Sequence, residues 1–240
     1  MTEPIAQIWV YLAASPLLGL TLTLLAYQTA FALFQRSGQH PLANPVMIAV
    51  AILAIFLWLT GTAYETYFAG AQFVHFMLGP ATVALAVPLY TQFRRVSSLL
   101  TPILAGLLAG SLTAIVSAVL VGRLFGASAS TQLSLAPKSV TTPIAMGIAE
   151  RIGGLPSLTA VLVIFTGVLG AISARHIFDA IKVHDPAIRG FALGVASHGI
   201  GTARALQVNE QSGAFAALAM GLNGLLTALL LPLISQWLVR

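Results

Sequence analysis

The chain has 240 residues, of which 58% are apolar and 7% charged, and its mean hydropathy is +0.94. Because an ordinary soluble domain carries about 25% charged residues, this composition excludes a water-soluble globular protein. The formal charge of +5 is spread over basic residues that stand singly or in pairs, which excludes a nucleic-acid-binding face, and the absence of Cys excludes disulfides and thiolate catalysis.

Apolar stretches recur along the whole chain, and most are long enough to cross a bilayer, which takes roughly 20 residues of helix. The first covers about residues 8–34, and we expect a retained helix there because Glu3 makes the N-terminus acidic, unlike a secretory signal. The later segments are predicted at about residues 45–62, 72–91, 99–121, 130–150, 156–173, 190–206 and 213–238. The sequence therefore predicts an all-α polytopic membrane protein of about six to eight segments, forming one domain over residues 1–240.

Two of these segments are interrupted by proline and resemble each other. Residues 78–83 and 135–140 share the pattern Leu-x-Pro-x-Thr/Ser-Val, and each copy is followed by a second proline, Pro88 or Pro143. Paired interruptions of this kind are typical of transporters with a substrate site near the membrane midplane. The alternative is two kinked packing helices with a chance similarity. Each segment either crosses as a broken helix or returns as a re-entrant hairpin, and the sequence leaves this choice open.

The second interrupted segment carries a charge, because Lys138 stands beside Ser139, Thr141 and Thr142. A cation facing lipid at mid-membrane depth costs at least about 2.5 kcal/mol. We therefore expect Lys138 to face a cavity or an anion, unless its long side chain reaches the membrane surface.

The segment at about residues 190–206 also contains polar residues, namely Ser197, His198, Thr202 and Arg204. At helical spacing His198 and Thr202 share a face, which favours a polar lining of the same cavity or a proton path. A helix–helix hydrogen bond is the alternative for His198. The sequence has no nucleophile or metal constellation, so we expect neither an enzyme nor a resident metal.

Basic residues predict the orientation of two loops. Arg94 and Arg95 stand in one of them, and Arg175, Lys182 and Arg189 in the other. Because cytoplasmic loops are enriched in Lys and Arg, both are predicted to lie on the cytoplasmic side. The side of the N-terminus stays open, since it depends on how the interrupted segments cross.

Three stretches closely resemble the LrgB/CidB family: residues 78–90, 137–146 (PKSVTTPIAM) and 196–204 (ASHGIGTAR). The resemblance implies a bacterial inner-membrane protein, described as antiholin-like or as a regulator of murein hydrolases, often encoded beside a small LrgA/CidA-type membrane partner. The plastid member of the family is a glycolate/glycerate translocator, which implies small 2-hydroxy carboxylates as substrates.

The resulting hypothesis is a secondary transporter of small organic anions that works by alternating access, with an antiholin-like pore or murein hydrolase regulator as the alternative. We expect a homo-oligomer, in the form of a homodimer, in the lipid bilayer, with no cofactor and with H+ or Na+ left open as a coupling ion. The predicted substrate-binding residues are Pro80, Thr82, Lys138, Ser139, Thr141, Thr142, Ser197, His198, Thr202 and Arg204.

Overall fold

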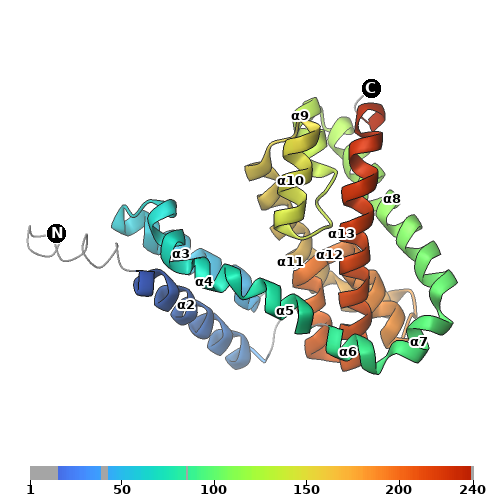
Figure 1. Cartoon of the computed structure of the whole chain (residues 1–240), viewed down its shortest axis with the longest axis horizontal. Helices are drawn as coiled ribbons and strands as arrows, with labels where there is room; N and C mark the ends of the chain where they lie inside the picture. Colours follow the sequence, from blue (N-terminus) through green and yellow to red (C-terminus); the bar gives the residue numbers. More distant parts are fainter. Residues whose placement is uncertain (1–15, 39–42, 85, 239–240) are drawn as a thin grey trace, which may run out of the picture. The chain divides into compact units, whose positions relative to one another are not determined.

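The structure, a computed structural model, describes residues 16–38, 43–84 and 86–238, and these form helices and no strand (Figure 1). The chain divides into two compact units, Met1–Ala84 (unit 1) and Leu85–Arg240 (unit 2), and each is described by itself. The expectation of one domain over residues 1–240 stays a prediction.

Unit 1 contains α2 (Pro16–Arg36), α3 (Pro45–Thr60), α4 (Tyr64–Phe76) and α5 (Leu78–Ala84). The buried centre of the contact between α2 and α3 consists of small residues, Ala26 and Ala30 against Ala49, with partly buried Ile and Leu side chains of α3 around them. The predicted interruption of residues 72–91 is confirmed, because α4 ends before α5 begins. Residues 8–15 of the first predicted span lie outside the described residues.

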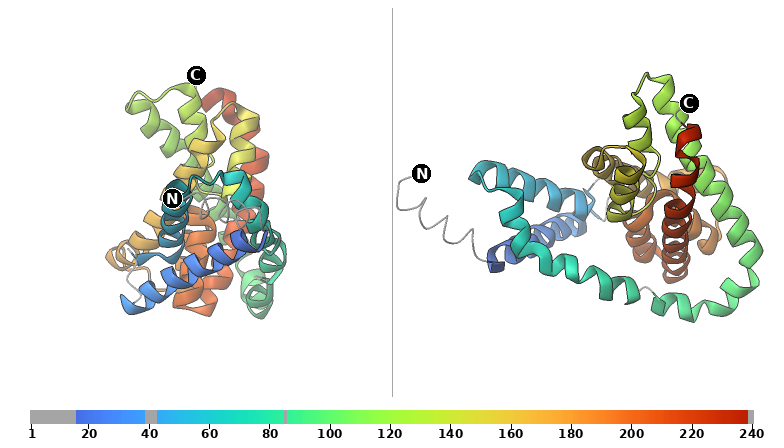
Figure 2. Two further views of the ribbon diagram at one scale, coloured as in Figure 1. Left: turned by 90° about the vertical axis from the view of Figure 1, so that its left-hand side faces the viewer. Right: turned by 45° about the horizontal axis from the view of Figure 1, so that its top comes forward.

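Unit 2 contains α6 (Ala86–Thr91), α7 (Phe93–Ser98), α8 (Leu100–Leu124), α9 (Ala129–Leu135), α10 (Thr142–Ile152), α11 (Pro156–Ala180), α12 (Pro186–Val208) and α13 (Glu210–Leu238). Helix α13 packs along α12, and α8 runs along the edge of this unit (Figures 1 and 2). Among the described residues, α8, α11, α13 and residues 17–36 of α2 are long and apolar enough to cross a membrane, and α3 is a shorter apolar helix. The chain is therefore an all-α, multi-pass membrane protein.

The segment that contains Pro137 is a re-entrant hairpin. Helix α9 ends at Leu135, the connection to α10 is not helical (Figure 1), and α10 then returns to the level of α9. The return is fixed by Ser134, whose Oγ accepts a hydrogen bond of 2.7 Å from the backbone N–H of Leu155. This segment, residues 129–152, is called the first hairpin, and its form is that of the hairpin alternative for this one of the two interrupted segments.

Helix α12 also reverses its direction, at Ser197 and His198. His198 has φ 40° and ψ −135°, which no helix contains. A Cβ added at Gly201 would lie 2.8 Å from the Leu193 carbonyl oxygen, whereas a straight helix separates these two positions by about 12 Å. Residues 199–208 therefore fold back on residues 186–196.

Each limb is roughly 16 Å long, about half of the hydrocarbon thickness. The segment predicted at residues 190–206 is thus a second hairpin, Pro186–Val208, and the reversal is a feature that the sequence pattern did not predict.

Glycines allow the second hairpin to pack closely against its neighbours. A Cβ added at Gly190 or Gly194 would overlap the carbonyl oxygens of Ser212 and Ala216 on α13. A Cβ added at Gly170 of α11 would overlap the Ser197 hydroxyl. Small residues of this kind are typical of close helix contacts in membranes.

Candidate functional site

One side chain on α13 joins the two hairpins. The amide Nδ2 of Asn223 donates hydrogen bonds to the carbonyls of Ser139 (3.2 Å) and Val195 (3.0 Å). The Ser139 carbonyl has no helical donor, because the residue four positions later is Pro143. Val195 lies two residues before the reversal of the second hairpin. Asn223 therefore satisfies backbone groups at both interruptions.

The position of Asn223 also gives the depth of this junction. Its Oδ1 accepts a hydrogen bond of 2.5 Å from the hydroxyl of Ser111. Ser111 lies near the middle of α8 and Asn223 near the middle of α13, and both helices are long enough to cross the bilayer. The two hairpins therefore meet near the membrane midplane.

A cavity of about 730 Å³ lies beside this junction. Lys138 and Ser139 line it from the first hairpin, Ser197 from the second, and Thr166 from α11. Apolar residues of α8 and of the first limb of α12 complete most of the wall. A few polar groups that converge in a largely apolar cavity are typical of a small-ligand site.

Lys138 supplies the positive charge of the cavity. Its Nζ lies 3.4 Å from the Ser139 hydroxyl. The ion pairs of the described residues are Arg95–Asp185, Arg175–Asp179 and Arg189–Asp179, and none of them includes Lys138. A cation at this depth without a carboxylate partner favours an anion in the cavity.

Ser197 adds an unpaired hydroxyl to the same wall. The residue is 1% exposed, and its Oγ has no hydrogen-bond partner in the part of the chain that the structure describes. Leaving a buried hydroxyl unpaired costs about 1–3 kcal/mol. A ligand oxygen that accepts a hydrogen bond from Ser197 would remove this cost.

His198 and Thr202 hold the reversal of the second hairpin and are not among the cavity-lining residues. The Nε2 of buried His198 lies 2.9 Å from the Val163 carbonyl, which is the helix–helix hydrogen bond considered from the sequence. The Thr202 hydroxyl donates to the His198 carbonyl at 2.8 Å. The His198 ring therefore contacts the backbone of α11, whereas Thr202 bonds to the backbone at the turn itself.

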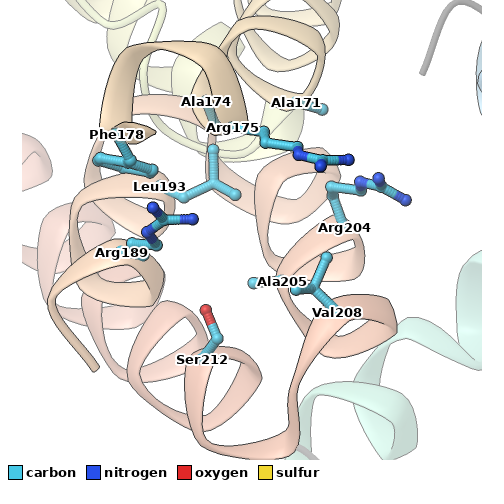
Figure 3. Close-up of a pocket in the computed structure, with 10 residues that line it drawn as sticks. All are labelled: Ala171, Ala174, Arg175, Phe178, Arg189, Leu193, Arg204, Ala205, Val208 and Ser212. Atoms are coloured by element: carbon cyan, nitrogen blue, oxygen red, sulfur yellow. The ribbon is translucent and has the colours of Figure 1, made fainter. Parts of the chain in front are cut away.

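The remaining predicted site residues lie elsewhere. Thr141 and Thr142 are half-buried at the start of α10, and neither lines the cavity. Arg204 lines a separate pocket of about 220 Å³ (Figure 3). Pro80 is exposed on α5 in unit 1, and the side chain of Thr82 lies outside the described residues.

The cavity extends to an ion pair at the start of α12, where Arg95 contacts Asp185 at 2.7 Å. Asp185 also caps α12 by accepting hydrogen bonds from the N–H groups of Ala187 and Ile188. This contact brings the two basic loops together at one end of unit 2, as expected for two loops on the same side of a membrane.

Asn223 and Ser111 were missed by the sequence-based interpretation. Asn223 is an isolated amide in the apolar stretch 213–238. Because polar residues inside membrane helices are rare and usually face a partner or a cavity, this isolation was the available signal.

Comparison with known proteins identifies the family. Residues 23–237 match the model of the LrgB-like family. The chain belongs to the LrgB-like family. It is similar to proteins named antiholin-like protein LrgB from Bacillus mycoides (strain KBAB4), Bacillus cereus (strain B4264) and Bacillus anthracis (strain CDC 684 / NRRL 3495), each 30% identical over 219 residues that cover 91% of this chain and 95% of the relative. No solved structure matches the chain. The resemblance predicted from residues 78–90, 137–146 and 196–204 is therefore confirmed, and the LrgB-like match includes both hairpins and Asn223.

Proposed function

We propose that this chain is a secondary transporter of small organic anions in the bacterial inner membrane, with 2-hydroxy carboxylates such as glycolate, glycerate and lactate as substrates. The observation that carries the proposal is Lys138, which lines a midplane cavity between two re-entrant hairpins and has no carboxylate partner within the described ranges.

The chemistry of the cavity wall matches such a substrate. A carboxylate can accept a charge-assisted hydrogen bond from the Lys138 ammonium. The hydroxyls of Ser139, Thr166 and Ser197 can bond to the remaining oxygens, including the 2-hydroxyl group. A ligand without a negative charge would leave the ammonium uncompensated, so the site favours anions over neutral sugars or alcohols.

Re-entrant hairpins also support alternating access. Transporters with discontinuous helices expose a fixed midplane site to one side and then the other by moving one bundle against the rest. Here the two hairpins and α13 form one connected group through Asn223. We propose that this group moves as a body and carries the site, with H+ or Na+ as the coupling ion.

Uptake into proteoliposomes tests the proposal. Wild-type protein should show saturable uptake of labelled glycolate, glycerate or lactate, and Lys138→Gln should abolish it. Lys182, the second lysine of the chain, is exposed in the loop before α12, so Lys182→Gln is a matched control that should retain uptake. Absence of saturable flux for all three anions would contradict the transporter proposal.

The names of the relatives favour a second candidate, an antiholin-like regulator of murein hydrolase activity that acts with an LrgA/CidA-type membrane partner. A homodimer fits either candidate. The two functions predict different results for Lys138→Gln in cells. A transporter loses both anion uptake and any lysis phenotype, whereas a regulator that binds no anion keeps its effect on autolysis when Lys138 is neutral.

A further inference from the structure

A second pocket, of about 220 Å³, is lined by three arginines from three helical segments (Figure 3). Arg175 belongs to α11, Arg189 to the first limb of α12, and Arg204 to the second limb. None of the three lines the Lys138 cavity. In Figure 3 the side chains of Arg175 and Arg204 project toward the same side of the pocket.

The acidic residues near this pocket do not balance its charge. Asp179 pairs with Arg189 at 2.5 Å and with Arg175 at 3.8 Å. Arg204 contacts Gln207 Oε1 at 3.4 Å and has no ion pair in the described part of the chain. One carboxylate therefore pairs with two of the three guanidinium groups and leaves Arg204 without an ion pair, so the pocket keeps a net positive charge.

The rest of the pocket wall is mainly apolar, with three alanines and the larger side chains of Phe178, Leu193 and Val208. A charged rim above an apolar floor suits an amphiphilic anion better than a fully solvated one. The pocket also lies at the end of unit 2 where the basic loops meet. The positive-inside pattern predicts that this end faces the cytoplasm, and the cytoplasmic leaflet is the one that carries negative surface charge.

We propose that this pocket binds the phosphate group of an anionic phospholipid such as phosphatidylglycerol. The guanidinium groups of Arg175 and Arg204 hold the phosphate oxygens, and the apolar floor contacts the glycerol and the first methylene groups. Because Leu193 of the apolar floor stands on the first limb of the second hairpin and Arg204 on the second, the bound lipid joins both limbs to α11. This site is independent of anion transport through the Lys138 cavity.

Native mass spectrometry of the full chain in detergent tests the site with defined lipids. Wild-type protein should retain phosphatidylglycerol at least about tenfold more tightly than phosphatidylcholine. The double variant Arg175→Gln/Arg204→Gln should reduce this ratio to about one. Arg151→Gln, which removes an exposed arginine from the end of α10, is the matched control and should keep the wild-type ratio.

Two further arms make the outcome decisive. If the double variant does not fold, Arg204→Gln alone replaces it, since among the described residues the Arg204 side chain has a hydrogen bond only with Gln207, on the same limb. The single variant should lower the ratio several-fold. If millimolar inorganic phosphate displaces the lipid, the pocket is an anion site and its ligand is free phosphate. If phosphate does not displace the lipid, the lipid headgroup is the ligand. Equal retention of both lipids by wild-type protein, or wild-type selectivity in the variants, overturns the proposal.

Discussion

The amide of Asn223 donates a hydrogen bond of 3.2 Å to the carbonyl of Ser139, and so connects a membrane-spanning helix to the interruption of the first hairpin. Its second N–H reaches Val195 in the second hairpin. Two interrupted segments that are distant in sequence thus share one hydrogen-bonding side chain near the midplane. The Lys138 cavity lies beside this junction, so the stability of the junction and the function of the site are linked.

Replacing Asn223 tests this junction. Asn223→Ala leaves two buried carbonyls without their donor, so the variant should be destabilised by about 2–4 kcal/mol. Gln236→Ala, at an exposed position on the same helix, is the control and should be nearly neutral. Thermal unfolding in detergent measures both. An unchanged unfolding temperature for Asn223→Ala would mean that the carbonyls find other donors and that the junction does not depend on this amide.

Gly170 provides a test of the close approach between α11 and the second hairpin. A methyl group at this position would overlap the Ser197 hydroxyl, so Gly170→Ala must displace Ser197 from the cavity wall. We expect a loss of about 1–3 kcal/mol in stability together with weaker anion binding. Gly221 is a helical glycine with open space around its Cβ position, so Gly221→Ala should be neutral or slightly stabilising. Equal behaviour of the two variants would rule out the predicted overlap.

The backbone at His198 allows two opposing effects to be separated. A positive φ is unfavourable for histidine and not for glycine, whereas the Nε2 contact with Val163 needs the imidazole ring. His198→Ala loses the contact and keeps the strain; His198→Gly loses the contact and relieves about 1 kcal/mol of strain. The glycine variant should therefore unfold at the higher temperature. The reverse order would show that the reversal does not require a positive φ.

Part of this architecture could be predicted from the sequence, because proline residues inside an apolar segment indicate an interrupted helix. Pro137 and Pro143 predicted the interruption before α10, and the position of Lys138 within it predicted a charged cavity, which the structure places beside Ser139. The reversal of α12 could not be predicted in this way. Ser197 and His198 are compatible with a helix, and the glycines near them are common in membrane helices that do not bend.

The positions of His198 and Arg204 show a further limit of predicting a site from helical periodicity. From the sequence, both residues are expected to line the same cavity or proton path. Because the limbs of α12 fold back, His198 packs against Val163 while Arg204 lies with Arg175 and Arg189 in a different pocket. The network at Asn223 depends on long-range pairing in the same way, since Ser111, Ser139 and Val195 come from three separate segments.

The central claim is that a positive charge at position 138 binds the transported anion, and chemical restoration of that charge tests it most directly. The natural chain has no Cys, so Lys138→Cys introduces a single reactive thiol. Alkylation with 2-bromoethylamine then rebuilds a lysine-like ammonium side chain, and iodoacetamide provides a neutral control of similar size. Uptake of labelled glycolate, glycerate and lactate into proteoliposomes is measured for each form.

We predict that Lys138→Cys and its iodoacetamide product show no saturable uptake, and that the aminoethylated protein recovers it. Saturable uptake by the neutral forms, or failure of the aminoethylated protein to exceed them when wild-type protein transports, would contradict a role for this charge.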